Sequence, residues 1–287
     1  MPDIHGTTKL LGIIGYPVEH SLSPVMQNAA LMQLGQDTVY IPLPVAPPQL
    51  EAALAGMAAI ALQGFNVTIP HKQAILPLLD AVTPLAQQIG AVNTVWRTER
   101  GWQGTNTDVA GFMAPLQPLA RDWRNITPLV LGNGGAARAV VAGCVELGCP
   151  RVVVMGRNPE KLAAFARSWT DAAIRQCLTV QSWETLDAWL PQSQLLVNTT
   201  PLGMAPHIAE SPVTPAQLTQ LPDGAIAYDL IYTPRPTQFL AQAQAAGATI
   251  IDGTEMLVQQ GAAALSQWLG QPAPVAVMRS ALLGALT

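Results

Sequence analysis

Short apolar runs that end at glycine or proline recur along the chain. Runs of this kind predict buried strands, and apolar residues spaced three and four positions apart predict helices. The first half carries such runs at 9–17, 38–43 and 64–69 and a hairpin pattern at 91–96 and 101–104. The second half carries them at 129–131, 151–155, near Thr179 and Leu195, at 225–232 and at 249–253, before a helix from Glu255. This order predicts an α/β protein.

Segment 129–138 joins a predicted strand to a predicted helix through a glycine turn. Gly132, Gly134 and Ala137 occupy the three small-residue positions of a dinucleotide-binding fingerprint. The first permits the turn, the second lets the backbone approach a pyrophosphate, and the third allows close helix packing. Glycine turns between strand and helix are common, so the motif alone is a weak signal.

The end of the next strand indicates which dinucleotide would bind. NAD-binding chains usually place an acidic residue there for the ribose 2′-hydroxyl. This chain has Gly156-Arg157-Asn158-Pro159-Glu160-Lys161 instead. Arg157 and Lys161 suit a 2′-phosphate, so we expect NADP(H). On the alternative interpretation both are solvated charges, and Asn158 is only the N-cap of a helix that begins with Pro159.

A polar loop at 19–24 precedes the first predicted helix. Ser23 is the expected N-cap of that helix, with Pro24 as its first residue. Capping leaves Ser21 without a role, and two hydroxyls beside a helix N-terminus also suit a substrate carboxylate.

Polar side chains interrupt the other predicted strands of the first half. Asn66 and Thr68 share one face of a strand and need partners, which a ligand could supply. Lys72 follows at the carboxyl end of that strand, where open α/β sheets bind ligands, although a lone lysine is more often solvated. Asn93 is unusual in a strand, and Asp108 lies in a polar cluster that helix capping alone could explain.

Composition narrows the class of protein. The chain has 287 residues, of which 49% are hydrophobic and 11% charged, enough for two compact domains. The net charge of −4 without a basic run argues against nucleic acid and anionic membranes. The longest apolar run, 52–62, is too short for a membrane span, and no signal peptide is evident, so we expect a cytoplasmic protein. Three cysteines and four scattered histidines predict neither a disulfide framework nor a metal site.

Eight motifs occur in the order in which the shikimate dehydrogenase family has them, and together they span nearly the whole chain. They are Ser21-Leu22-Ser23-Pro24, Asn66-Val67-Thr68-Ile69-Pro70-His71-Lys72, Gly90-Ala91-Val92-Asn93-Thr94, Gly104-Thr105-Asn106-Thr107-Asp108, 132–136, Asn198-Thr199-Thr200, Tyr228-Asp229-Leu230-Ile231-Tyr232 and Met256-Leu257-Val258-Gln259-Gln260. By these motifs the sequence resembles the NADP-dependent shikimate dehydrogenases of the aromatic amino-acid (chorismate) pathway. It departs from the family's usual residues at Asn133, His71 and Gly156.

The resemblance implies a role for each matching position. Lys72 and Asp108 would be the catalytic pair, and Ser21 and Ser23 would hold the shikimate carboxylate. The other substrate contacts would come from Thr68, Asn93, Tyr232 and Gln260. The implied NADP(H) contacts are Gly132, Asn133, Gly134, Gly135 and Ala136 in the turn, Arg157, Asn158 and Lys161 at the 2′-phosphate, and Leu230 and Gly253 near the nicotinamide.

The implied architecture has two α/β domains. Residues 1–113 would form the substrate-binding catalytic domain, on which 255–287 packs back, and 114–254 would form a doubly wound (Rossmann) NADP-binding domain. The expected partner is a small molecule, shikimate or 3-dehydroshikimate, with no nucleic acid or membrane, and the chain would be a monomer or a homodimer.

Two alternatives stay open. A quinate/shikimate dehydrogenase that prefers NAD would carry an acidic residue where this chain has Arg157. A module that only senses NADP or shikimate would have no reason to keep both Lys72 and Asp108.

Overall fold

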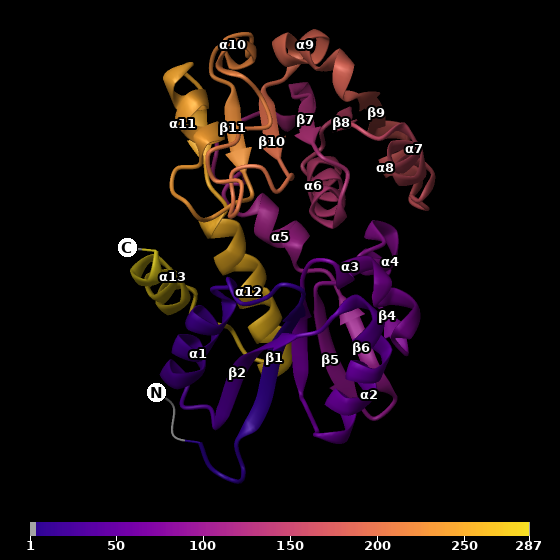
Figure 1. Cartoon of the computed structure of the whole chain (residues 1–287), viewed down its shortest axis with the longest axis vertical. Helices are drawn as coiled ribbons and strands as arrows, with labels where there is room; N and C mark the ends of the chain where they lie inside the picture. Colours follow the sequence, from indigo (N-terminus) through magenta and orange to yellow (C-terminus); the bar gives the residue numbers. More distant parts are fainter. Residues whose placement is uncertain (1–3, 287) are drawn as a thin grey trace. The chain divides into compact units, whose positions relative to one another are not determined.

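The computed structural model describes residues 4–286 and divides the chain into two compact units (Figure 1). Met1–Gly111 and Leu257–Thr287 form the first unit, and Phe112–Met256 forms the second. The boundaries expected at 113 and 255 therefore lie two residues from the divisions after 111 and before 257. Helix α12 (Thr254–Leu269) carries the chain from the second unit back to the first.

The first unit is built on a mixed six-stranded sheet. Its order is β2 (Thr38–Pro44), β1 (Lys9–Gly15), β3 (Gly64–Val67), β5 (Thr94–Thr98), β6 (Gly101–Thr105) and β4 (Ala81–Val82). β5 and β6 form the predicted hairpin and β5 runs antiparallel to β3, whereas β2, β1 and β3 are parallel. β4 escaped prediction because two residues show no periodicity.

Helices of the first unit cover this sheet with apolar faces. Met26, Val258, Leu265 and Met278 form one core cluster with Leu11 and its neighbours. Three of these side chains come from α12 and α13, the segment that we expect to pack back on the first part of the chain. The helices are α1 (Ser23–Gln33), α2 (Leu50–Ala59), α3 (His71–Ala74), α4 (Pro84–Ile89), α5 (Asp108–Met113), α12 and α13 (Val275–Ala285), with 3-10 turns η1 (Pro47–Gln49) and η2 (Leu76–Leu78).

The second unit is built on an all-parallel six-stranded sheet. Its order is β12 (Thr249–Ile251), β11 (Ile226–Asp229), β10 (Leu195–Asn198), β7 (Pro128–Leu131), β8 (Val152–Gly156) and β9 (Leu178–Ser182). The chain leaves β7 in one direction along the sheet and returns to β10 on its other side, which is the doubly wound order expected. Ligands of such sheets bind outside the carboxyl ends of the strands, at this reversal point.

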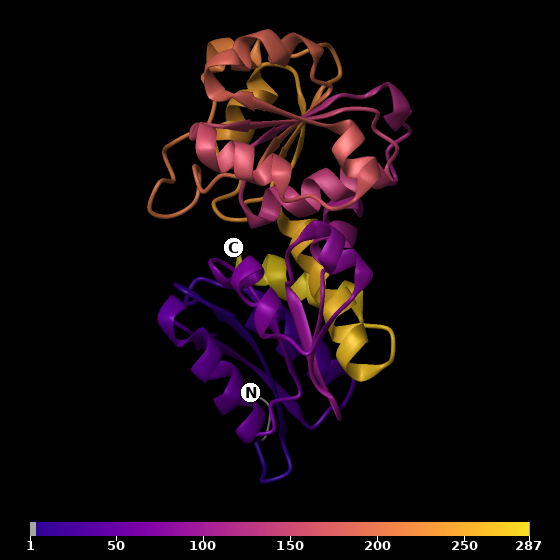
Figure 2. The same cartoon turned by 90° about the vertical axis from the view of Figure 1, so that its right-hand side faces the viewer.

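Helices lie on both faces of the second sheet (Figure 2). They are α6 (Gly135–Glu146), α7 (Pro159–Arg167), α8 (Ala172–Cys177), α9 (Leu186–Trp189), α10 (Pro215–Leu218) and α11 (Gln238–Ala245), with 3-10 turns η3 (Trp123–Asn125), η4 (Trp183–Thr185) and η5 (Leu190–Gln192). Within residues 4–286, no helix has the length and apolar character required to cross a bilayer.

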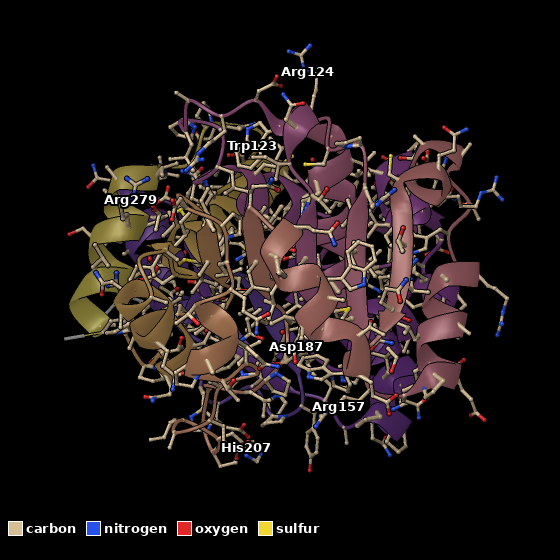
Figure 3. The ribbon with its side chains drawn as sticks, turned by 90° about the horizontal axis from the view of Figure 1, so that it is seen from above. Trp123, Arg124, Arg157, Asp187, His207 and Arg279 are labelled. Carbon is tan, nitrogen blue, oxygen red and sulfur yellow. The ribbon has the colours of Figure 1, made fainter. Side chains whose placement is uncertain are left out.

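Figure 3 identifies the two ends of the second sheet. Trp123 and Arg124, which precede β7, lie at one end of the strands, and Arg157 and His207, which follow β8 and β10, lie at the other. The second end therefore consists of the carboxyl ends of the strands, where the predicted cofactor residues lie.

Candidate functional site

Lys72 and Asp108 are in direct contact in the first unit. Lys72 lies in α3 and its Nζ donates to Oδ2 of Asp108, the first residue of α5, at 2.5 Å. The side chains are 17% and 6% exposed, so the carboxylate is buried and the lysine side chain is partly exposed. The contact fixes the direction of an amine that still has protons to donate.

The carboxylate of Asp108 is not used to cap its helix. The backbone N–H of Asp108 donates to Oδ1 of Asn106 at 2.9 Å, so the Asn106 side chain satisfies the start of α5. Both oxygens of Asp108 are bound by other side chains, Oδ2 by Lys72 and Oδ1 by Nδ2 of Asn93 at 2.8 Å. Capping therefore does not explain Asp108.

Asn93 connects the catalytic candidates to α12. It precedes β5, so its expected place within a strand is wrong. Its Nδ2 lies 2.8 Å from Asp108 Oδ1 and 3.3 Å from Gln260 Oε1, and its Oδ1 accepts from the backbone N–H of Thr107 at 2.7 Å. Four predicted site residues, Lys72, Asp108, Asn93 and Gln260, thus form one connected cluster.

The structure contradicts the predicted helix cap at Ser23. Helix α1 begins at Ser23, its N-cap is Leu22, and no side chain caps it, so Ser23 is not the N-cap. Instead the Ser23 N–H donates to Oγ of Ser21 at 3.3 Å. Ser23 is buried beside the Tyr40 phenol. Burial raises the pKa of Tyr40 well above its ordinary value, although a hydrogen bond with Ser23 opposes this shift.

Asn66 has its partners inside the protein. Its Oδ1 accepts from the Tyr40 hydroxyl at 2.8 Å, and its Nδ2 donates to Asn93 O at 3.0 Å and Thr94 Oγ1 at 3.1 Å. The idea that a ligand satisfies Asn66 is therefore wrong. Thr68 lies beyond the end of β3, half-buried, and its carbonyl accepts from the N–H of His71 at 2.9 Å where the chain enters α3.

The glycine turn after β7 leaves the N-terminus of α6 open. Gly132 has φ +103°, and a Cβ there would lie 2.8 Å from Thr199 Oγ1. A Cβ on Gly134, the N-cap of α6, would meet nothing within 4 Å. The N-terminus of α6 is therefore exposed backbone with room for an anion, beside β10 at the reversal point of the sheet.

The 2′-phosphate candidates lie exposed beyond β8. Arg157 and Lys161 both face solvent, and Asn158 Oδ1 accepts from the Lys161 N–H at 2.9 Å, which confirms Asn158 as the N-cap of α7. Two of the three departures from the family's usual residues lie together, since a Cβ on Gly156 would be 3.5 Å from Asn133 Cγ. A side chain at 156 would therefore be in van der Waals contact with the Asn133 amide.

Leu230 and Gly253 are neighbours at the carboxyl ends of β11 and β12. A Cβ on Gly253 would lie 2.1 Å from the Leu230 carbonyl oxygen, so only glycine fits there. The Gly253 N–H donates to Ile231 O at 3.0 Å. Tyr232 follows in the same loop of the second unit, half-buried.

Comparison with known proteins gives the family. A protein of Synechocystis sp. named shikimate dehydrogenase (NADP(+)) is 59% identical over 283 residues, covering 99% of this chain and 98% of its own. The chain belongs to the shikimate dehydrogenase family. Two family models match it as well, the shikimate dehydrogenase substrate binding domain at 13–95 and the shikimate 5′-dehydrogenase C-terminal domain at 253–283.

Solved shikimate dehydrogenases share the whole fold. One in complex with NADP+ superposes with a TM-score of 0.89 at 34% identity and covers 99% of this chain and 98% of its own. One from Thermus thermophilus, in complex with NADP(H) and shikimate, has a TM-score of 0.84 at 35% identity and covers 97% and 100%. The predicted fold class, a substrate domain with a Rossmann-type NADP domain, is confirmed.

The shikimate dehydrogenase motifs also contain buried residues for which the sequence suggested no role. Asn198 and Asp229, each the last residue of a strand, are both 0% exposed and bonded to each other at 3.0 Å. A polar residue at the end of an apolar strand is the signal that could have found them.

Proposed function

We propose that this chain is an NADP-dependent shikimate dehydrogenase that reversibly reduces 3-dehydroshikimate to shikimate. The observation that carries the proposal is the buried contact between Asp108 and the partly open amine of Lys72. A module that only senses its ligands has no use for this pair, and 59% identity to a named NADP+ enzyme favours the same chemistry.

The proposal gives Lys72 the proton transfer. NADPH, when bound in the second unit, would supply the hydride that reduces the ring carbonyl carbon. As negative charge develops on the carbonyl oxygen, an ammonium beside it stabilises that charge and delivers a proton. Lys72 leaves this step as a neutral amine and regains its proton from water, which its 17% exposure permits. In the oxidation of shikimate the same amine, when neutral, takes the hydroxyl proton.

Asp108 holds the Lys72 side chain in one orientation, because its Oδ2 accepts a hydrogen bond from Nζ at 2.5 Å. Asn93 in turn holds Asp108, because its Nδ2 donates a hydrogen bond to Oδ1 of Asp108. The remaining substrate contacts that we propose are Ser21, Ser23, Thr68, Tyr232 and Gln260.

We assign the second unit to NADP(H). The free N–H groups at the start of α6 would receive the pyrophosphate, with Gly132, Asn133, Gly134, Gly135 and Ala136 around it. Arg157 and Lys161 would pair with the 2′-phosphate, as forked donor and point charge, and Asn158 would hold the start of α7 between them. Leu230 and Gly253 would border the nicotinamide.

The decisive experiment follows NADPH absorbance with 3-dehydroshikimate, with NADH as the comparison cofactor and 3-dehydroquinate, the oxidised form of quinate, as the comparison substrate. We expect consumption of NADPH at a rate that exceeds the rate with NADH. A faster reaction with NADH and with 3-dehydroquinate would favour the quinate/shikimate alternative. Binding of NADPH and shikimate without turnover would favour the sensing module.

A cytoplasmic location and a monomeric or homodimeric state complete the proposal. Cys144, Cys149 and Cys177 are all free, as is usual in a reducing compartment. Sedimentation of the purified chain with and without NADPH would distinguish monomer from dimer.

A further inference from the structure

Asp229 is a buried carboxylate that the proposed proton transfer does not use. It ends β11 opposite Asn198, which ends β10, and both residues are 0% exposed. Its Oδ1 accepts from Asn198 Nδ2 at 3.0 Å and from the Ile231 N–H at 3.1 Å, and its Oδ2 accepts from Thr237 Oγ1 at 2.6 Å. Every one of these donors is neutral. Removing a carboxylate from water without a cation beside it is costly, so its place at this edge requires an explanation.

The three bonds of Asp229 join segments that surround the proposed cofactor site. The bond to Ile231 fixes the turn that carries Leu230, whose carbonyl lies against Gly253. The bond to Thr237 fixes the far end of the same loop, because Thr237 also caps α11 by accepting from the Leu240 N–H at 3.3 Å. Loop 230–237 is therefore held at both ends by one carboxylate.

Asn198 extends the network to the glycine turn. Its Oδ1 accepts from the N–H and the hydroxyl of Thr200 at 2.9 and 2.7 Å. The neighbouring Thr199 donates twice to Leu131 O, and a Cβ on Gly132 would strike the Thr199 hydroxyl. One connected set of bonds thus runs from the loop after β11 to the turn after β7.

We propose that Asp229, Asn198 and Thr237 are positioning residues for NADP(H), which set the geometry of the loops after β10 and β11 at the nicotinamide end of the site. The inference rests on the proposed function, because that function places the cofactor at this edge. Loops already held in the binding geometry bind more tightly, since the apparent dissociation constant rises as the fraction of competent molecules falls.

The burial that makes Asp229 unusual also makes it sensitive to its surroundings. Its pKa is raised to about 7, chiefly by burial and slightly by the charge of Asp252, against the lowering effect of hydrogen bonds from Thr237, Ile231 and Asn198. A group of this kind is typical of positions kept for function, because an apolar residue there would cost the fold less.

The test compares Thr237→Val with Thr237→Ser and with Ser193→Ala. Thr237→Val removes the donor to Asp229, and Thr237→Ser retains it. Ser193 is a matched control, since it is also 0% exposed, donates to Trp189 O at 2.8 Å and precedes β10 at the opposite end of the sheet. The readouts are the dissociation constant of NADPH by fluorescence titration without substrate, and the melting temperature.

We expect Thr237→Val to raise the NADPH dissociation constant by about 5- to 30-fold. Thr237→Ser should bind NADPH with the wild-type dissociation constant. Ser193→Ala should lower the melting temperature and leave the NADPH dissociation constant unchanged. If Thr237→Val and Ser193→Ala both lower the melting temperature and neither weakens NADPH binding, the network is only structural and the inference is overturned. Failure of the wild-type chain to bind NADPH would overturn the proposed function instead, which keeps the two failures apart.

Discussion

The two units prepare for their ligands in opposite ways. In the first unit the reactive side chains are already bonded to one another, with Asp108 buried between Lys72 and Asn93. In the second unit Arg157 and Lys161 stand exposed. Proton transfer needs an amine at a fixed distance and angle before the substrate arrives, because misplacement by an ångström reduces the rate strongly. A 2′-phosphate brings its own charge and can order flexible cations as it binds.

The largest effect should come from the amine in the first unit. Lys72→Ala should lower kcat by about 10²- to 10⁴-fold with little change in the KM for shikimate, since the proton is delivered in the transition state. The matched control is Lys9→Ala, which removes a lysine at the start of β1 in the same unit and should retain full activity. A Lys72→Ala enzyme that is impaired in binding alone would contradict the assignment of proton transfer.

The next effect concerns the carboxylate that holds the amine. Asp108→Asn should lower kcat by about 10- to 10³-fold, because a neutral amide loses the charge-assisted contact that orients Lys72 and can turn its N–H₂ toward the Asn93 N–H₂. The double variant with Lys72→Ala should lose less than the product of the two single losses, since the residues act as one unit.

The helix cap offers the internal control for this prediction. Asn106 caps α5 in both enzymes, so stability should change little through capping. Full activity of Asp108→Asn would show that the Lys72 contact is not needed for turnover.

In the second unit the effect should be smaller and confined to one cofactor. Arg157→Ala should raise the KM for NADPH by about tenfold and leave that for NADH nearly unchanged, since only NADPH presents a phosphate. Charged hydrogen bonds at exposed sites are weak, so the exposure of Arg157 limits the expected increase in KM to about tenfold. Arg151→Ala is the control, because Arg151 is equally exposed but precedes β8 at the opposite end of the strand. Equal effects on both cofactors would place the 2′-phosphate elsewhere.

Elements with a strong local pattern could be predicted, and contacts between distant segments could not. The glycine turn, the parallel strands of the second unit and the Asn158 cap are encoded within a few consecutive residues. The partners of Asn66 come instead from β2 and β5, because the antiparallel register places Asn66 opposite Thr94. The pairing of these distant strands cannot be predicted from the residues around Asn66 alone.

The Ser23 cap was mispredicted for a related reason. Proline is accepted at either of the first positions of a helix, so the sequence Ser21-Leu22-Ser23-Pro24 fits a start at Ser23 or one residue later. Burial of Ser23 against Tyr40 favours the earlier start. The candidate catalytic residues were named from the family motifs, and only the fold shows how Asp108 is held.

The smallest effect should appear in the pH dependence of stability, and it belongs to the second unit. The Asp229 carboxyl has a folded pKa of about 7 against an ordinary value of 3.8, so the folded state binds its proton more tightly than the unfolded state does. Between about pH 4 and 7 the folded protein therefore holds more protons, and the free energy of unfolding falls as pH rises, by up to about 1.4 kcal/mol per pH unit from this group. This contribution is fully present below pH 4 and lost above pH 7.

Asp229→Asn tests that sign, because the amide has a similar shape and does not ionise. The wild-type melting transition of the second unit should move down by roughly 5–9 °C between pH 5 and 7, because about 2.3 kcal/mol is lost over that interval and 1 kcal/mol corresponds to about 2–4 °C for a unit of this size. In Asp229→Asn this downward shift should be largely absent, whereas Ser193→Ala should keep the wild-type slope at a lower melting temperature. Parallel curves for wild type and Asp229→Asn would mean that Asp229 does not titrate in this window. The contrast between the two units would then rest on exposure alone.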